Sequence, residues 1–155
     1  KGRGRSGAAR QQDRYRPLGR PEVLKVLQSQ DMLPAITFIF SRAGCDGALY
    51  QCLRSRMVLT SQEEAQQIKD IVDAGVEGIP EEDLQVLDFK RWREALSRGF
   101  AAHHAGMLPA FRHIVEDLFV RGLVRAVFAT ETLALGINMP ARTVVLMPSR
   151  AMTEP

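Results

Sequence analysis

The chain has 155 residues, 45% hydrophobic and 25% charged, a balance typical of one globular domain with a buried core. No apolar run approaches the roughly 20 residues of a transmembrane helix, and no apolar segment follows the basic N-terminus, so we expect a cytoplasmic protein without a membrane anchor. Residues 1–20 carry seven basic side chains and one acidic, whereas the remainder carries fourteen basic and seventeen acidic. The net charge of +3 is therefore no argument that the folded body binds nucleic acid.

Residues 1–20 are predicted to form a basic flexible linker. They are rich in Gly, Arg, Ser and Gln and have no hydrophobic periodicity, which is typical of a segment that is disordered when alone. Their arginines could follow phosphates through non-specific attraction, but a solvated spacer is the simpler interpretation.

The folded part, residues 21–155, begins with a predicted helix over 21–30, whose Val23, Val26 and Leu27 should face inward. The segment 35–40 (AITFIF) has high β propensity and is expected to be a strand. A helix over 43–54 should follow. It places Cys45 and Cys52 on one face, where we expect reduced core thiols instead of a disulfide.

Residues 55–98 are predicted to be a helical insert that packs on one face of the sheet. Thr60 and Ser61 precede Glu63 and Glu64, so two capping-box registers are available for its first long helix. Asp88 can cap a later helix. We expect the inward positions to be apolar and the acids to be solvated surface, since no acidic pair follows a strand. The expected inward residues are Ala65, Ile68, Ile71, Val72, Phe89, Trp92 and Leu96.

Residues 99–147 read as strand 101–104, a helix that begins at Pro109 and ends at Gly122, strand 124–129 and strand 143–147. The helix carries apolar residues at the spacing of one face, and the two later strands are nearly continuous apolar runs, as in parallel strands buried on both faces. Strand, crossover helix and parallel strand form a βαβ unit. The apolar face comprises Phe111, Ile114, Val115, Leu118 and Phe119.

Polar residues end or directly follow three of the predicted strands: Ser41–Arg42, His103–His104 and Thr130–Glu131–Thr132. Ligands of open α/β sheets bind at the carboxyl ends of the strands, so we expect a functional edge here. The alternative for Ser41–Arg42 is an ordinary strand-to-helix turn. The two histidines invite a zinc site, but adjacent strand residues point to opposite faces and no ligand pair has zinc-finger spacing. No metal site is predicted, and a structural role or hydrogen bonding near a nucleic-acid channel is favoured.

Two strings resemble helicase motifs. LPAITFIFSRAGCD, residues 33–46, resembles motif IV, and AVFATETLALGINMPA, residues 126–141, resembles motif V. Together with AAHHAGMLPAFRHIVEDLFVRGLV between them, they make residues 20–146 similar to the second RecA-like domain of superfamily 2 DExH-box helicases, in the superkiller and exosome-associated branch and close to its HelY-type bacterial members. The implied fold is α/β: a partial RecA-like three-layer domain with a mainly parallel sheet and a helical insert, the C-terminal lobe of a P-loop NTPase helicase.

The resemblance implies two groups of binding residues. Nucleic acid would be contacted by Ser41, Arg42, His103, His104, Thr130, Glu131 and Thr132. The nucleotide would be approached by Gly136, Ile137 and Asn138, where glycine lets the backbone come close to a ligand.

The chain lacks a GxxxxGK[ST] phosphate loop, a DExH string and the QxxGRAGR string that the family carries further on; it ends in MPSRAMTEP instead. We therefore expect a fragment without catalytic residues, which binds no cofactor alone. Its parent would be a monomeric ATP-dependent RNA helicase that uses ATP and Mg²⁺, with RNA (possibly DNA) and the missing first RecA-like domain as partners. The alternative is a catalytically inactive, stand-alone α/β module that binds RNA or protein.

Overall fold

The computed structural model describes residues 20–130 and 141–146, and within these ranges it contains four strands and six helices. The strands are β1 (Ala35–Phe38), β2 (Phe100–His103), β3 (Ala126–Ala129) and β4 (Thr143–Leu146). The helices are α2 (Arg20–Ser29), α3 (Arg42–Arg54), α4 (Gln62–Gly75), α5 (Glu81–Leu87), α6 (Phe89–Ser97) and α7 (Pro109–Val120). Each expected helix and strand is present, with ends that differ by a few residues. None of the described helices is long and apolar enough to cross a lipid bilayer.

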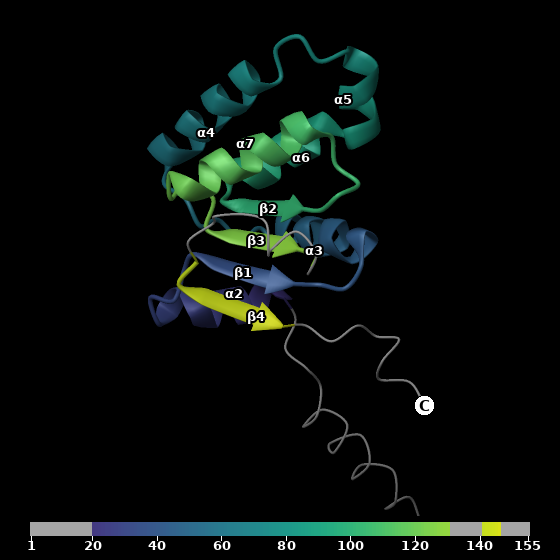
Figure 1. Cartoon of the computed structure of the whole chain (residues 1–155). Helices are drawn as coiled ribbons and strands as arrows, with labels where there is room; N and C mark the ends of the chain where they lie inside the picture. The colour runs from purple at the N-terminus through teal and green to yellow at the C-terminus, as the bar shows by residue number, and fades with distance from the viewer. Residues whose placement is uncertain (1–19, 131–140, 147–155) are drawn as a thin grey trace, which may run out of the picture.

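The four strands form one sheet in the order β2-β3-β1-β4, and every pairing is parallel, as predicted. β3 lies between β2 and β1, so strands far apart in sequence are neighbours (Figure 1). Parallel neighbours end at the same edge of the sheet, and helices must return the chain to the opposite edge. The fold is thus α/β, consistent with a partial RecA-like lobe.

The helices enclose the β2 side of the sheet most completely. α3 packs on β2 and β3, and α2 packs on α3. α6 and α7 both pack against β2, α4 bridges α6 and α7, and α5 lies on α6. Figure 1 shows α4 to α7 gathered beyond the β2 edge, with β4 at the opposite edge. The helical insert therefore reaches the sheet at its β2 edge, mainly through α6.

The apolar patterns of the longer helices are confirmed. All five expected residues of α7 are buried, as are Ile68 and Val72 of α4 and Trp92 and Leu96 of α6. The Trp92 ring lies 5.2 Å from that of Phe111, centroid to centroid. Cys45 and Cys52 are buried and unbridged, as expected.

Two expectations about burial are wrong. The last strand was expected to be buried, but in β4 the side chains of Val144 and Leu146 are 58% and 71% exposed. β4 pairs with β1 at the edge of the sheet, and no helix among residues 20–130 packs closely on that face. In α2, Leu24 and Leu27 are buried and Val26 is exposed. Leu24 and Leu27, spaced i and i+3, lie on the same face of the helix, and that face is the one turned inward.

The capping residues were predicted in part. Of the two capping-box registers, the structure uses Ser61 with Glu64: the Glu64 N–H donates to the Ser61 hydroxyl, and the Ser61 N–H donates to the Glu64 carboxylate. The Thr60 hydroxyl instead donates to the Ser97 carbonyl at 2.6 Å. Asp88 precedes α6 in a left-handed conformation, but its carboxylate contacts Arg91 and caps no backbone N–H.

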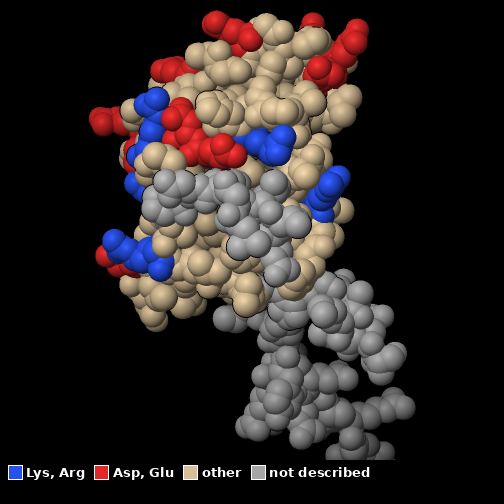
Figure 2. Space-filling view, viewed as in Figure 1, with Lys and Arg blue, Asp and Glu red and all other residues tan. Residues whose placement is uncertain are grey.

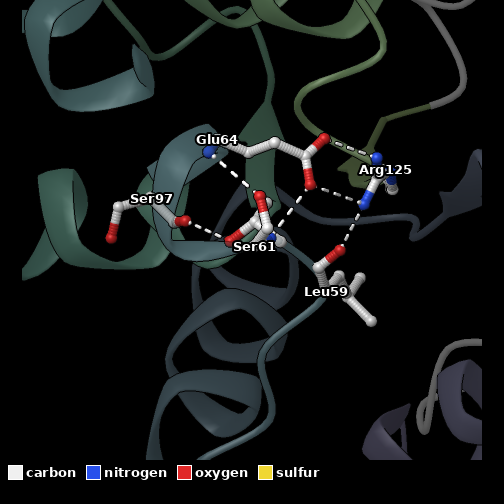
Figure 3. Close-up of polar contacts among 6 residues, drawn as sticks. Leu59, Ser61, Glu64, Ser97 and Arg125 are labelled. Atoms are coloured by element: carbon white, nitrogen blue, oxygen red, sulfur yellow. Dashed lines mark hydrogen bonds and ion pairs between the residues drawn. The ribbon is translucent and has the colours of Figure 1, made fainter. Parts of the chain in front are cut away.

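Arg125 joins the insert to the sheet just before β3 (Figure 3). Its guanidinium donates to the Leu59 carbonyl at 2.5 Å and to the Glu64 carboxylate at 2.6 Å. The Ser61 backbone hydrogen bond and Arg125 lower the pKa of Glu64. Figure 2 shows other acids of α4 and α5 on the surface at the end of the molecule formed by these helices, as expected. Glu64 departs from that expectation, because it serves both as a cap and as an ion-pair partner.

Candidate nucleic-acid interface

The carboxyl ends of β2, β3 and β1 lie side by side. Register pairs Ala129 with both His103 and Phe38. Beyond the last pairs, the Ile39 N–H donates to the Ala129 carbonyl at 2.9 Å and the Thr130 N–H to the His103 carbonyl at 3.4 Å. The sheet thus brings three segments predicted from sequence to one edge: the turn after β1, the histidine pair and Thr130.

The turn after β1 is closed by Ser41, the N-cap of α3. Its hydroxyl oxygen accepts the Gly44 N–H at 2.9 Å, which leaves the hydroxyl hydrogen able to donate outward from an exposed side chain. A Cβ at Gly44 would lie 2.7 Å from both the Ile39 side chain and the Ser41 hydroxyl. The turn is therefore an ordinary helix start in its backbone, as the alternative interpretation held, and it also presents a polar donor at the sheet edge.

Arg42 is the first residue of α3, and its side chain is exposed. Its guanidinium makes no hydrogen bond or ion pair with any residue that the structure describes. The amino end of a helix carries partial positive charge, to which Arg42 adds a full charge and a planar fork of donors. This combination suits an anionic oxygen such as that of a phosphate.

His103 points toward α7. Its ring is 1% exposed, and its Nε2 lies 2.9 Å from the Glu116 carboxylate, while its Nδ1 is buried without a hydrogen-bond partner among the described atoms. Burial lowers the pKa of His103, and the hydrogen bond that its ring donates to Glu116 opposes that shift only in part. The ring is therefore neutral near pH 7, with the hydrogen on Nε2 donated to Glu116.

His104 points the other way, toward α3. Its ring is also buried, and its Nε2 lies 3.0 Å from the Asp46 carboxylate. The Gly106 N–H donates to its Nδ1 at 3.1 Å. An acceptor at Nδ1 carries no hydrogen, so Nε2 carries it and donates to Asp46. This assigns one neutral tautomer to His104.

The two rings thus lie on opposite faces of the sheet, as expected for the last residue of β2 and the extended residue that follows it. They share no ligand site, and the described residues contain no group of three potential metal ligands. Because both rings are buried and paired with carboxylates, the geometry favours the structural role over direct hydrogen bonding in a channel. Ser41, Arg42 and the half-buried Thr130 present the accessible polar atoms.

The remaining predicted site residues lie outside the described part of the chain. These are Glu131, Thr132, Gly136, Ile137 and Asn138. Conversely, the structure adds Asp46, Gly106 and Glu116, which sequence reasoning missed. Asp46 lies inside the motif IV string and four residues after Arg42. That spacing places both side chains on one face of a helix, and it could have identified Asp46 as a neighbour of Arg42 from the sequence.

The chain aligns with known helicases along most of its length. It is 65% identical over 132 residues to "Probable helicase HelY" of Mycobacterium tuberculosis, which is 85% of this chain and 15% of that protein. It is 48% identical over 124 residues to the DExH-box ATP-dependent RNA helicase DExH15 of Arabidopsis thaliana, 77% of this chain and 10% of that protein. It is 33% identical over 129 residues to the human exosome RNA helicase MTR4, 83% of this chain and 12% of that protein.

The chain belongs to the DExH-box helicases of the superkiller and exosome-associated branch. The resemblance noted from motifs IV and V is thereby confirmed at the level of the family. No family model matches the chain. This helicase chain spans 10–15% of the length of the three relatives, so what it aligns with is a small part of each.

Proposed function

We propose that this chain is part of the second RecA-like domain of an ATP-dependent RNA helicase and that it binds the nucleic-acid backbone. The observation that carries the proposal is the carboxyl edge of β1 and β3, where Ser41, Arg42 and Thr130 present donors. Most protein contacts to a nucleic-acid backbone come from arginine forks and from hydroxyl and amide donors. The helicase relatives support this assignment over an unrelated α/β domain.

The nucleotide part of the proposal concerns motif V and the first RecA-like domain. The described edge offers neutral and cationic donors, which suit phosphate oxygens, and no group of three potential ligands that would hold Mg²⁺. In the proposal, Gly136 to Asn138 approach ATP from this side, while the first RecA-like domain holds the phosphates and Mg²⁺. ATP hydrolysis supplies the energy for movement along RNA, and this chain alone hydrolyses none. We propose a monomeric, cytoplasmic parent enzyme.

Binding to RNA can be tested on the 155-residue chain itself. Isotope-labelled protein is titrated with a single-stranded oligouridylate, and backbone and arginine side-chain signals are followed by NMR. The proposal expects saturable shifts at Ser41, Arg42 and Thr130. Arg42→Ala should weaken these shifts, whereas Arg54→Ala, at the exposed far end of the same helix, should not. The same titration with oligothymidylate distinguishes RNA from DNA.

Binding of RNA through the basic N-terminal segment alone is the result that would contradict the proposal. Residues 1–20 attract any polyanion through their charge, and such binding falls steeply with salt. Shifts confined to residues 1–20, with none at the turn after β1, would contradict the proposal.

A further inference from the structure

Arg42 and Asp46 are spaced to form an ion pair but do not. They lie at i and i+4 on α3, a spacing at which arginine and aspartate on a helix surface are within reach of each other, although the order with the acid first pairs better. Both residues are described, yet no salt bridge joins them. The Asp46 carboxylate accepts instead from His104 Nε2 at 3.0 Å, although the Asp46 side chain remains 51% exposed. The partner that Asp46 takes is 58 residues away in sequence and comes from the end of β2.

The loop after β2 holds the His104 ring in place for this contact. The Gly106 N–H donates to Nδ1, and the Met107 N–H donates to the His104 carbonyl at 3.2 Å. A Cβ at Gly106 would lie 3.1 Å from His104 Nδ1 and 3.3 Å from the Arg42 Cδ. A side chain at position 106 would therefore crowd both the imidazole and the Arg42 chain, and glycine leaves room for them over this loop. The ring is fixed as the tautomer whose hydrogen points at Asp46.

Two donors, His104 and Arg42, are within reach of the one Asp46 carboxylate. Without His104, the cation of α3 that is spaced to reach Asp46 is Arg42. An Arg42 guanidinium paired with Asp46 would have to give up that contact before it could bind a phosphate, and the carboxylate would repel the phosphate. With His104 in place, Asp46 is satisfied and Arg42 keeps its donors.

We propose that His104, seated by Gly106, diverts Asp46 from Arg42 and so keeps the Arg42 guanidinium available to an anionic backbone oxygen. His104 is a positioning residue: it is buried and acts through Asp46, not by touching nucleic acid. The inference rests on the proposed function for its anion, but the diversion of Asp46 is a property of the chain alone. It also gives the buried histidine a role that neither metal binding nor simple packing supplies.

A rescue experiment separates diversion from loss of structure. In the 155-residue chain, His104→Phe removes the donor while keeping a ring in the buried site. The proposal expects oligouridylate affinity, read from the Thr130 signal, to fall about twofold, the factor by which one exposed i, i+4 ion pair on a helix would compete for Arg42. Asp46→Ala alone should bind at least as tightly as the wild type. His104→Phe with Asp46→Ala should recover most of the lost affinity, because no carboxylate is left to capture Arg42.

Two outcomes overturn the inference. Either Asp46→Ala weakens binding, or the double variant binds as poorly as His104→Phe although its thermal melt matches that of Asp46→Ala. If His104→Phe does not fold, His104→Leu, which also removes the donor to Asp46, is compared with and without Asp46→Ala in the same way.

A measurement without RNA keeps this inference apart from the proposed function. Exchange of the Arg42 guanidinium hydrogens with water should slow in His104→Phe, when Asp46 pairs with Arg42, and return to the wild-type rate in the double variant. If exchange behaves so but Arg42→Ala leaves RNA binding unchanged, the diversion stands and the proposed function fails. If exchange is the same in all variants, the diversion is refuted.

Discussion

The link between Arg125 and Glu64 should stabilise the domain more than a surface ion pair does. It ties α4 of the helical insert to the start of β3, and both side chains are about two-thirds buried, at 34% and 26% exposure. Arg125→Met keeps the aliphatic stem but removes the donors to Glu64 and to the Leu59 carbonyl. Glu64→Gln keeps an oxygen for the Ser61 N–H and removes the charge.

The magnitude follows from the contacts. A hydrogen bond to a charged group contributes about 1.5–3 kcal/mol when buried and less when partly solvated. We therefore expect Arg125→Met to lower the free energy of unfolding by about 2 kcal/mol, and the coupling between the two substitutions to be about 1–2 kcal/mol. The pair Arg121–Asp117 on α7 is the matched control: its contact is 3.0 Å, but its side chains are 54% and 38% exposed. Its coupling should be about 0.3–0.5 kcal/mol.

Urea unfolding of the 155-residue chain measures both couplings. Trp92, the single tryptophan, is 1% exposed and reports unfolding by fluorescence. Four proteins are needed for each pair: the wild type, two single variants and the double variant. Equal couplings for the two pairs, or a coupling at Glu64 that vanishes in 0.5 M salt, roughly where screening removes surface interactions, would refute the reasoning.

Two further predictions concern buried titratable groups. Burial lowers the pKa of His103 below its usual 6.5, so the unfolded chain binds more protons in mildly acidic solution, and stability should fall as the pH drops from 7 through 6.5. The His103→Gln variant has no imidazole to titrate, so the urea midpoint of its unfolding should change less with pH over that range. An equally steep pH dependence in the variant would show that another group is responsible. Burial raises the pKa of Cys45 and Cys52 to about 12. Iodoacetamide should therefore label neither thiol at pH 8 in the native chain and both in urea, and rapid native labelling of either would contradict the buried placement.

The sequence predicted best what depends on neighbours along the chain. The face of α7 follows from i, i+3, i+4 spacing, and its start and end follow from Pro109 and Gly122. Buried apolar runs predicted parallel strands. The Ser61–Glu64 cap was one of two registers that local pattern allowed, and the choice between them came from elsewhere: Glu64 pairs with Arg125, and the Thr60 hydroxyl binds the Ser97 carbonyl 37 residues away.

What sequence could not supply depends on which elements meet. The apolar run of β4 reads as a buried strand, but its position at the sheet edge leaves alternate residues exposed. The histidine pair was predicted to lie at the carboxyl end of its strand, and it does. That the rings face α3 and α7, and take Asp46 and Glu116 as partners, follows only from the packing of those helices on the two faces.

The central claim is that this chain works as part of a helicase that couples RNA binding to ATP hydrolysis. The direct measurement replaces the 132 aligned residues of Mycobacterium tuberculosis HelY by those of this chain and compares RNA-stimulated ATP hydrolysis with that of native HelY. We predict that the hybrid keeps its RNA stimulation, that Arg42→Ala and Thr130→Ala lower it, and that Arg54→Ala does not. A folded hybrid that binds RNA but shows no stimulation, while native HelY does, would contradict the claim and favour the catalytically inactive binding module.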